Sequence, residues 1–334
     1  MSARKFSIVV PALFILGGVF LVPFGTKPST GQTAKKAPTK QTYAYPSFYK
    51  GFYLTSGSGN NRAKLERHIT RAKKAGLNAV VIDVQTPGMR VAVTPAEHVA
   101  YCRAMGFHPI ARVVVFPEGL SEYPAAAELI ENRLAVAEAA CRAGYREIQF
   151  DYIRFNDHRV NRALSLAERY EYITGFLKKA RERLSKYDVR IAADIFGRIP
   201  LNADDKIGQK MELLDGLVDV ICPMAYPSHY TWSKKMMADP YYTVHITSKR
   251  ALERAPRSAI VTWIQAFRMK VKRSKLGYDR YVAAQIKAVH DSGAGGYLLW
   301  NAAQDYAIPL AVAGEINRRR ARVASLSETP SGGN

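Results

Sequence analysis

The chain has 334 residues, of which 48% are hydrophobic and 23% are charged. These are values of globular proteins, so they exclude wholesale disorder, and the length suits one large α/β domain or two average ones. The three cysteines, Cys102, Cys141 and Cys222, are odd in number and lack a CxxC spacing, which argues against a disulfide framework or a structural zinc site. We expect three buried thiols.

The formal net charge of +21 is unusual for such a chain. Basic residues occur in the N-terminal tail, on stretches with helical spacing such as 178–186, and at 268–275 and 318–322. Either they form solvated helix faces and basic tails, or they contact an anionic envelope polymer or lipid head groups. A nucleic acid partner is not expected, because the sequence has no helix-turn-helix, zinc-finger or ribonucleoprotein-type pattern.

The first 25 residues have the pattern of an export signal or a membrane anchor. Arg4 and Lys5 precede a largely apolar run at 8–24, which is close to the length of a spanning helix and is followed by no clean cleavage site. We therefore expect export across a bacterial-type inner membrane, which leaves the protein membrane-anchored, periplasmic or extracellular. A flexible linker at 26–47, a folded domain at 48–322 and a disordered tail at 323–334 are predicted to follow.

From residue 48 onward, short apolar runs suited to buried parallel strands alternate with longer stretches of helical spacing. The apolar runs are at 51–56, 79–85, 109–116, 147–155, 190–197, 219–226, 259–267 and 296–301. The helical stretches are at 62–75, 95–105, 125–143, 166–184, 204–217, 243–254, 278–292 and 306–322. Eight strand–helix units of this kind predict an α/β fold, the (β/α)8 TIM barrel.

A doubly wound open sheet is the alternative, but such a sheet usually carries a glycine-rich phosphate loop. The segment at 56–61 begins like GxGxxG, yet Arg62 stands in the place of the third glycine, so a flexible turn is expected there. The sequence also lacks the GxxxxGK[ST], HExxH and GxSxG motifs. Ser228 and His229 make a poor nucleophile–base pair, because neighbours in sequence rarely face each other correctly.

The most informative stretch is the strand predicted at 147–155, EIQFDYIRF. In an extended chain Gln149 and Asp151 share one face, whereas Ile148, Phe150 and Tyr152 share the other. An ionised aspartate beside so much apolar surface is costly unless it is paired, hydrogen-bonded or used. Asp151 is therefore a candidate catalytic residue, and the alternative is a buried ion pair with Arg112 or Arg154.

Two more carboxylates, Asp83 and Asp194, close other predicted strands. Because the fourth and fifth strands are neighbours roughly 5 Å apart, Asp151 and Asp194 are expected to share one pocket. Two carboxyls that flank a bond are what glycoside hydrolysis needs, one as proton donor and the other as stabiliser or nucleophile. Crowding of two carboxyls separates their pKa values and so divides acid from base. For Asp83, a functional role and a hydrogen-bonded structural role fit equally well.

Aromatic, amide and basic side chains crowd the same predicted strand ends. Flat rings stack on sugar faces, and amides and arginines bind hydroxyls, so the pattern predicts a carbohydrate cleft. The candidate substrate-binding residues are Asp83, Arg112, Arg154, Tyr226, His229, Tyr230, Trp263, Gln265, Trp300 and Asn301, with Tyr152, Phe196 and Trp232 as further aromatic candidates. The alternative for each ring is packing between barrel and helices, and for His229 it is a simple loop position. Neither a metal ion nor an organic cofactor is expected.

Several blocks of the sequence, at 50–55, 78–83, 111–116, 147–155, 193–197 and 223–230, lead to a closing Trp300-Asn301. Together they resemble a glycoside-hydrolase-like TIM-barrel family of largely uncharacterised bacterial proteins, related in pattern to the α-amylase-type barrels. The resemblance spans about residues 48–308, and the blocks around Asp151 and at 223–230 are the most specific.

The resemblance implies that Asp151 is at the nucleophile position and Asp194 at the acid/base position, an assignment that corresponds to a retaining mechanism. Members of the family commonly have one or two acidic residues after the aspartate of the second strand. This chain has Gln85, Thr86 and Pro87 there, so no shared metal or third-carboxylate role for Asp83 is implied.

The sequence thus favours a glycoside hydrolase that acts on an envelope or extracellular polysaccharide or oligosaccharide, and the net charge suits an anionic one. The alternative is a non-catalytic carbohydrate-binding or envelope-organising barrel; other barrel hydrolases, metal-dependent ones included, come third. Carboxyls about 5–10 Å apart across an open cleft favour hydrolysis, while carboxylates each locked to an arginine favour the binding barrel.

Overall fold

The computed structural model describes residues 43–158 and 164–327. The segment at 1–25, predicted as an export signal or anchor, lies outside these residues. The compact unit that contains all the described strands begins at Ala44, near the predicted domain start at residue 48. No helix within the described part combines the length and the apolar character that crossing a membrane requires.

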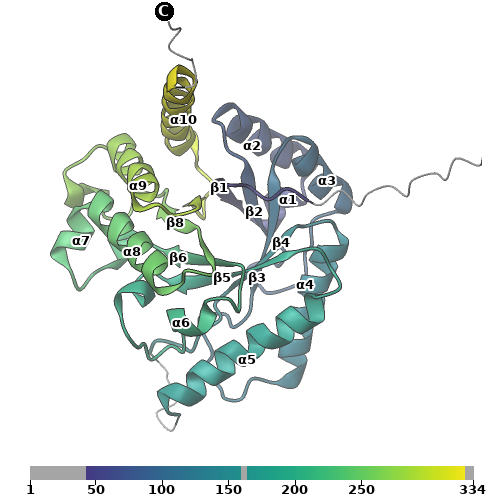
Figure 1. Cartoon of the computed structure of the whole chain (residues 1–334). Helices are drawn as coiled ribbons and strands as arrows, with labels where there is room; N and C mark the ends of the chain where they lie inside the picture. The colour runs from purple at the N-terminus through teal and green to yellow at the C-terminus, as the bar shows by residue number, and fades with distance from the viewer. Residues whose placement is uncertain (1–42, 159–163, 328–334) are drawn as a thin grey trace, which may run out of the picture. The chain divides into compact units, whose positions relative to one another are not determined.

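The strands form a closed barrel in which all neighbouring strands run parallel (Figure 1). They are β1 (Tyr49–Leu54), β2 (Ala79–Asp83), β3 (His108–Val114), β4 (Glu147–Asp151), β5 (Arg190–Phe196), β6 (Val220–Met224), β7 (Ala259–Ile260), β8 (Thr262–Gln265) and β9 (Gly296–Trp300). β1 pairs with both β2 and β9, so the ring closes. β7 and β8 both pair with β6 and are parts of one strand interrupted at Val261. The predicted TIM barrel is confirmed, and its closure excludes the open doubly wound sheet.

Helices surround the strands (Figure 1). The longer ones are α2 (Arg62–Lys74), α3 (Ala96–Ala104), α4 (Ala127–Arg142), α5 (Leu166–Leu184), α8 (Pro240–Arg254), α9 (Tyr278–Ser292) and α10 (Ala307–Ser327). α5 begins with a capping box, in which Ser165 and Glu168 each bond the other's backbone N–H. α9 ends at Gly293, whose φ of +81° suits glycine at a helix end. α10 continues beyond residue 322, where the sequence analysis had predicted the tail to begin.

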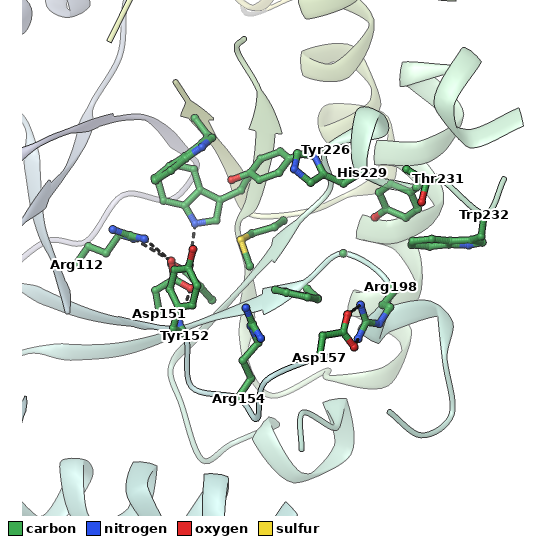
Figure 2. A pocket seen from close by; sticks show the side chains of 17 residues that line it. Arg112, Asp151, Tyr152, Arg154, Asp157, Arg198, Tyr226, His229, Thr231 and Trp232 are labelled. Carbon is green, nitrogen blue, oxygen red and sulfur yellow. Dashed lines mark hydrogen bonds and ion pairs between the residues drawn. The ribbon is translucent and has the colours of Figure 1, made fainter. Parts of the chain in front are cut away.

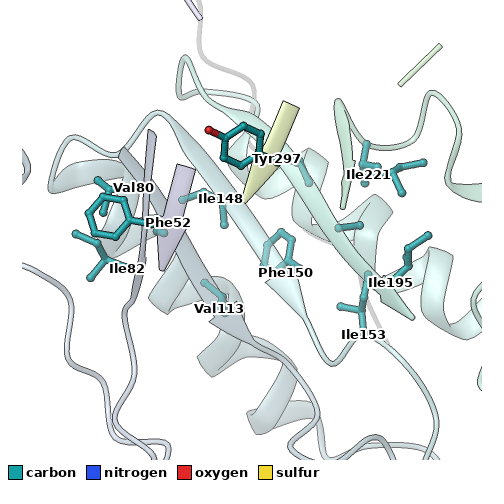
Figure 3. Close-up of a cluster of buried hydrophobic side chains, with 14 of the residues drawn as sticks. Phe52, Val80, Ile82, Val113, Ile148, Phe150, Ile153, Ile195, Ile221 and Tyr297 are labelled. Atoms are coloured by element: carbon teal, nitrogen blue, oxygen red, sulfur yellow. The ribbon is translucent and has the colours of Figure 1, made fainter. Parts of the chain in front are cut away.

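Alternate side chains of each strand face the barrel interior and the surrounding helices. Phe52, Val80, Ile148 and Phe150 belong to the large apolar layer between strands and helices (Figure 3). A smaller cluster fills the interior with Tyr49, Tyr53, Ala79, Val81, Ile110, Ala192, Val220, Cys222, Tyr226, Val261, Trp263 and Leu298. The two faces predicted for 148–151 are therefore correct. The three cysteines are buried free thiols, as predicted.

The helix predicted at 204–217 is wrong, because only Met211–Leu214 (α6) is helical. Gly208 has a φ of +80°, and a Cβ at this position would lie 3.0 Å from the backbone oxygen of Arg169. A left-handed glycine interrupts a helix. The Asp205 side chain also bonds Arg198, which ties this part of the chain to the loop after β5.

The flexible turn predicted at 56–61 is also wrong. Ser56–Gly59 form one turn of helix (α1), capped by Thr55, whose side chain accepts a hydrogen bond from the N–H of Ser58. A Cβ on Gly59 would lie 2.4 Å from Ile82. The glycine is therefore needed for close packing of α1 on β2.

Candidate functional site

Strand β4 sends three polar side chains into the barrel interior at successive levels. Glu147, at the amino end, accepts a hydrogen bond of 2.8 Å from the Tyr49 hydroxyl. Gln149 donates to the sulfur of Cys222 at 3.1 Å. The two-residue period then brings Asp151 to the carboxyl end of the strand, which is where barrels of this kind build their active sites.

The backbone turns sharply where β4 ends. The strand stops at Asp151 and does not continue to residue 155 as predicted. Tyr152 has a φ of +54°, a left-handed conformation that bulky residues rarely adopt and that occurs preferentially at functional sites. Its N–H donates to Asp151 Oδ1 at 2.5 Å, and both side chains line one cavity. The prediction that Tyr152 faces away from Asp151 is therefore wrong.

Asp151 is 5% exposed and is held by Arg112 of β3. Arg112 Nε and Nη2 donate to Asp151 Oδ2 at 3.0 and 2.6 Å, and Arg112 Nη1 donates to Asp83 Oδ1 at 2.6 Å. Together with the N–H of Tyr152, Asp151 thus accepts three hydrogen bonds, as an ionised carboxylate does. The ion pair considered from the sequence exists, and its cation is Arg112.

Asp194 of β5 lies beside Asp151 in the barrel, since Phe150 and Ala193 are partners in the register of the two strands. It is 1% exposed, and its Oδ1 accepts a hydrogen bond of 2.7 Å from Trp263 Nε1. Burial raises the pKa of Asp194 well above its ordinary value, and the charge of Asp151 raises it further; Arg112 and Trp263 act in the opposite direction. Asp194 is therefore suited to hold a proton next to an ionised neighbour.

Both carboxyls line a cavity of about 530 Å³. Figure 2 shows this cavity with Asp151 labelled. Nine residues predicted for the site line it: Arg112, Asp151, Arg154, Asp194, Tyr226, His229, Tyr230, Trp263 and Trp300. The additional aromatic candidates Tyr152, Phe196 and Trp232 line it as well. Trp263 and Trp300 meet edge to face at 5.5 Å between ring centroids, whereas Trp232 is 60% exposed. The lining therefore combines the polar groups Arg112, Asp151 and Asp194 with an aromatic wall that includes Trp263, Trp300 and Trp232.

Three predicted substrate-binding residues are not part of this lining. Gln265 accepts from the Ser228 N–H at 3.1 Å and donates to Met269 O at 2.8 Å. Asn301 donates to Ala266 O at 2.6 Å, and so anchors the turn after β9. Asp83 accepts from Arg112 and from the Tyr53 hydroxyl. All three hold backbone or side chains in place, so the structural alternative is the one that their contacts support.

His229 reaches the cavity from the short helix Pro227–His229 after β6. Burial lowers the pKa of His229, as does the charge of Lys270, so the imidazole is neutral near pH 7 and can bind a hydroxyl. Its Nδ1 lies 3.0 Å from Ser228 Oγ, a contact that the sequence analysis did not expect. Ser228 is 2% exposed and is not among the residues lining the cavity, so it is not placed to attack a substrate.

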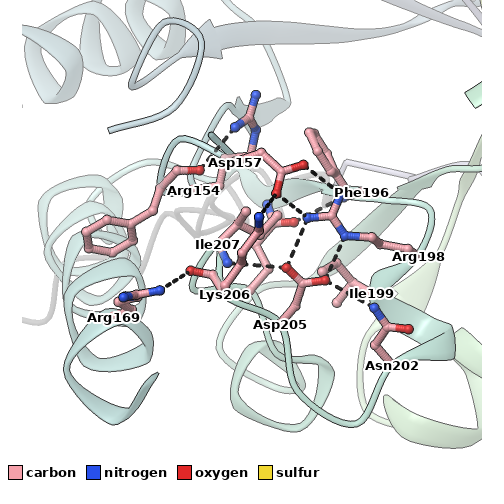
Figure 4. A network of polar contacts seen from close by, with 12 residues as sticks. Arg154, Asp157, Arg169, Phe196, Arg198, Ile199, Asn202, Asp205, Lys206 and Ile207 are labelled. Atoms are coloured by element: carbon pink, nitrogen blue, oxygen red, sulfur yellow. Dashed lines mark hydrogen bonds and ion pairs between the residues drawn. The ribbon is translucent and has the colours of Figure 1, made fainter. Parts of the chain in front are cut away.

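A polar network that sequence reasoning missed borders the cavity (Figure 4). Arg198 bonds two carboxylates, Asp157 at 3.0 and 3.1 Å and Asp205 at 2.7 and 3.1 Å. It joins the loop after β4 to the loop after β5, and Arg198 and Asp157 line the cavity. Loop residues follow no periodicity, so no pattern marked them. Among the residues that the structure describes, no three His, Cys, Asp or Glu side chains gather to hold a metal ion.

We predict that Asp83→Asn lowers stability more than it lowers any activity. Asp83 lies outside the cavity lining but bonds Arg112, so the amide would weaken one charged hydrogen bond at the base of the site. A loss of about 1–3 kcal/mol in the free energy of unfolding is expected, measured by urea denaturation. Loss of turnover without loss of stability would instead give Asp83 a direct role.

The chain resembles known proteins in its sequence profile and in its fold. The sequence profile of the DUF4015 family, described as "Putative glycosyl hydrolase domain", matches residues 122–306. A search of the curated proteins found no match. Several solved structures share the fold at low sequence identity.

The glycoside hydrolase domain of PgaB (BpsB) from Bordetella bronchiseptica is 12% identical, with a TM-score of 0.57 over 76% of this chain and 94% of that one. The spore cortex-lytic enzyme SleL from Bacillus cereus is 13% identical, with a TM-score of 0.56 over 82% and 75%. The endo-1,4-beta-mannanase from Rhizomucor miehei is 10% identical, with a TM-score of 0.59 over 84% and 99%. At these identities the likeness concerns the fold.

Proposed function

The chain belongs to the DUF4015 family, which is described as "Putative glycosyl hydrolase domain", and from this premise we propose that it hydrolyses an envelope or extracellular polysaccharide. Asp151 and Asp194 are the proposed catalytic pair. The observation that carries the proposal is that two carboxyls in opposite environments line one cavity at neighbouring strand ends. Asp151 is paired with a guanidinium, whereas Asp194 is buried against an indole N–H.

These environments suit a division of roles. Asp151, fixed as an anion, would stabilise or attack the oxocarbenium-like centre, and Asp194, with its raised pKa, would protonate the leaving oxygen. Adjacent parallel strands lie roughly 5 Å apart, so carboxyls at their ends can approach to the roughly 5 Å that separates the carboxyls of retaining enzymes. We therefore propose retention of the anomeric configuration.

The aromatic wall supports a sugar polymer as the substrate. Trp300 and Tyr226 line the inner cavity, while the exposed ring of Trp232 extends the wall outward. Rings of this kind offer flat apolar faces for sugars, and the neutral His229 offers a hydrogen-bonding group for a hydroxyl. A cavity of about 530 Å³ has the size of a ligand site and would hold a few sugar residues.

A non-catalytic carbohydrate-binding barrel is the second candidate, and one observation favours it. Asp151 is committed to Arg112 by two hydrogen bonds, and both aspartates are almost fully buried. A carboxylate in this state needs local movement before it can reach a sugar ring. Binding without turnover would follow if that movement does not occur.

Incubation of the protein with a panel of polysaccharides, followed by analysis of the products, separates the two candidates. Hydrolysis predicts new reducing ends and shortened chains, with the newly formed reducing end released in the anomeric form of the substrate. The binding barrel predicts retention on an immobilised polysaccharide with no product. Absence of both would contradict a carbohydrate function at this site.

We also propose that the N-terminal segment exports the protein and holds it at the membrane, because Arg4 and Lys5 precede the apolar run at 8–24. The full-length chain is expected to fractionate with membranes, and a fragment lacking residues 1–42 is expected to be soluble. Full-length chain found soluble and unprocessed in the cytoplasm would contradict this proposal.

A further inference from the structure

Arg154 is a buried cation in the cavity that forms no ion pair with any of the described residues. It is 6% exposed and follows Asp151 by three residues. Its Nη1 donates to Phe155 O at 3.0 Å, and its Nε is buried without a hydrogen-bond partner. The guanidinium lies over the ring of Phe196 at 4.4 Å and is directed into the cavity in Figure 2.

The other two arginines that line the cavity have carboxylate partners. Arg112 bonds Asp83 and Asp151, and Arg198 bonds Asp157 and Asp205. Within residues 43–158 and 164–327, by contrast, no carboxylate forms an ion pair with Arg154. A buried charge without an ion-pair partner is costly. Burial lowers the pKa of Arg154, and the charges of Asp151, Asp157 and Glu118, none of which forms an ion pair with it, offset only part of that shift. The Arg154 guanidinium is therefore buried in the cavity and available to pair with an anionic group of a ligand.

We propose that Arg154 binds the carboxylate of a uronic acid residue, so that the substrate of this site is an acidic polysaccharide. The inference rests on the proposed function, because it concerns the sugar held over Asp151 and Asp194. A guanidinium matches a carboxylate in shape and charge, and the bond between them is strong in a desolvated pocket. Since Arg154 and Asp151 come from the same strand end, the carboxylate belongs to a sugar ring at or next to the scissile bond.

Two further observations agree with an acidic substrate. The net charge of +21 attracts polyanions to the protein at low and moderate salt. The other two arginines of the lining are already paired with Asp151 and Asp157, so a uronate would compensate Arg154 without displacing an existing ion pair.

Matched pairs of substrates and variants test the inference on the full-length protein. Polygalacturonate, alginate and a β-glucuronan are each compared with their carboxyl-reduced, neutral counterparts, in hydrolysis and in binding to the protein. Arg154→Met removes the charge and leaves a side chain of similar volume. Arg154→Lys keeps the charge but lacks the planar guanidinium that can donate two parallel hydrogen bonds. Arg198→Met is the matched control, because Arg198 lines the same cavity and is paired with carboxylates.

The wild type is expected to prefer a uronate polymer over its neutral counterpart by about 10- to 100-fold in kcat/KM or Kd, the range for one charged hydrogen-bonded contact. Arg154→Met should abolish this preference, and Arg154→Lys should restore part of it. The melting temperature should stay unchanged or rise in Arg154→Met, because an unpaired buried charge is lost. It should fall in Arg198→Met, which leaves Asp157 and Asp205 without their cation.

The outcomes separate this inference from the proposed hydrolysis. Uronate binding that depends on Arg154, without any product, would support the inference and overturn hydrolysis. Cleavage of neutral polymers with no uronate preference would overturn the inference and leave hydrolysis standing. A melting temperature lowered equally in Arg154→Met and Arg198→Met, with no Arg154-dependent uronate binding, would make Arg154 a structural residue and overturn the inference.

Discussion

Asp151→Asn should lower turnover of the substrate polysaccharide by at least about a hundredfold, the lower range for a positioned catalytic group. Asparagine keeps the shape of the side chain but lacks the negative charge that an oxocarbenium-like transition state needs. Arg112 would still be paired with Asp83, so the arginine would not be left as an isolated buried charge. Initial rates with the purified variant, measured by reducing-end release, give the ratio.

The variant must be shown to be folded, because asparagine loses the ion pair with Arg112 and its amide N–H group faces other donors. Circular dichroism and the melting temperature provide that control, and Asp83→Asn provides a matched one, since it changes the other carboxylate bound to the same arginine. If a folded Asp151→Asn protein keeps near wild-type turnover, Asp151 is not the nucleophile or charge stabiliser. If the variant binds the polymer but does not hydrolyse it, Asp151 is needed for turnover and not for binding.

Much of the fold could be predicted from the sequence because the barrel repeats one simple pattern. Buried strands such as Ala79–Asp83 and Glu147–Asp151 are short apolar runs, and each is followed by a helix of distinct period. Parallel strands that close a ring bring their carboxyl ends together, so the sequence predicts Asp151 and Asp194 in one pocket. Both line the same cavity.

The local sequence pattern leaves the direction of a side chain undetermined at strand ends and in loops. Gln265 and Asn301 stand at strand ends like the lining residues, yet they bond neighbouring backbone, which only the three-dimensional path of the loops decides. Tyr152 faces the cavity because its backbone turns left-handed, and the alternation of an extended strand predicts the opposite face. Arg198 and Asp157 lie in loops, whose sequence has no period to mark them.

Asp194→Asn should have an effect that depends on the leaving group. Asparagine can still accept the hydrogen bond from Trp263 through its oxygen, so the site should keep its form. It cannot donate the proton, and turnover of the polysaccharide, whose leaving alcohol is poor, should fall by about 10²–10⁴-fold. The leaving group of an aryl glycoside of the same sugar departs with little protonation. With this substrate, the initial burst of aryl alcohol that the variant releases should remain near that of the wild type.

The pH dependence of the two proteins provides the control for this prediction. The pKa of Asp194 is raised by burial and by Asp151, so wild-type turnover should decline on the alkaline side as this carboxyl loses its proton. A raised pKa in the folded state also means that the stabilisation is complete at acid pH and is lost as the pH rises through the folded-state value. In Asp194→Asn the alkaline decline in activity should be absent with the aryl glycoside. The melting temperature of the variant should fall less than that of the wild type as the pH rises from the ordinary pKa of an aspartic acid to the raised pKa of Asp194. An unchanged alkaline limb in the variant would assign the proton donor to another group.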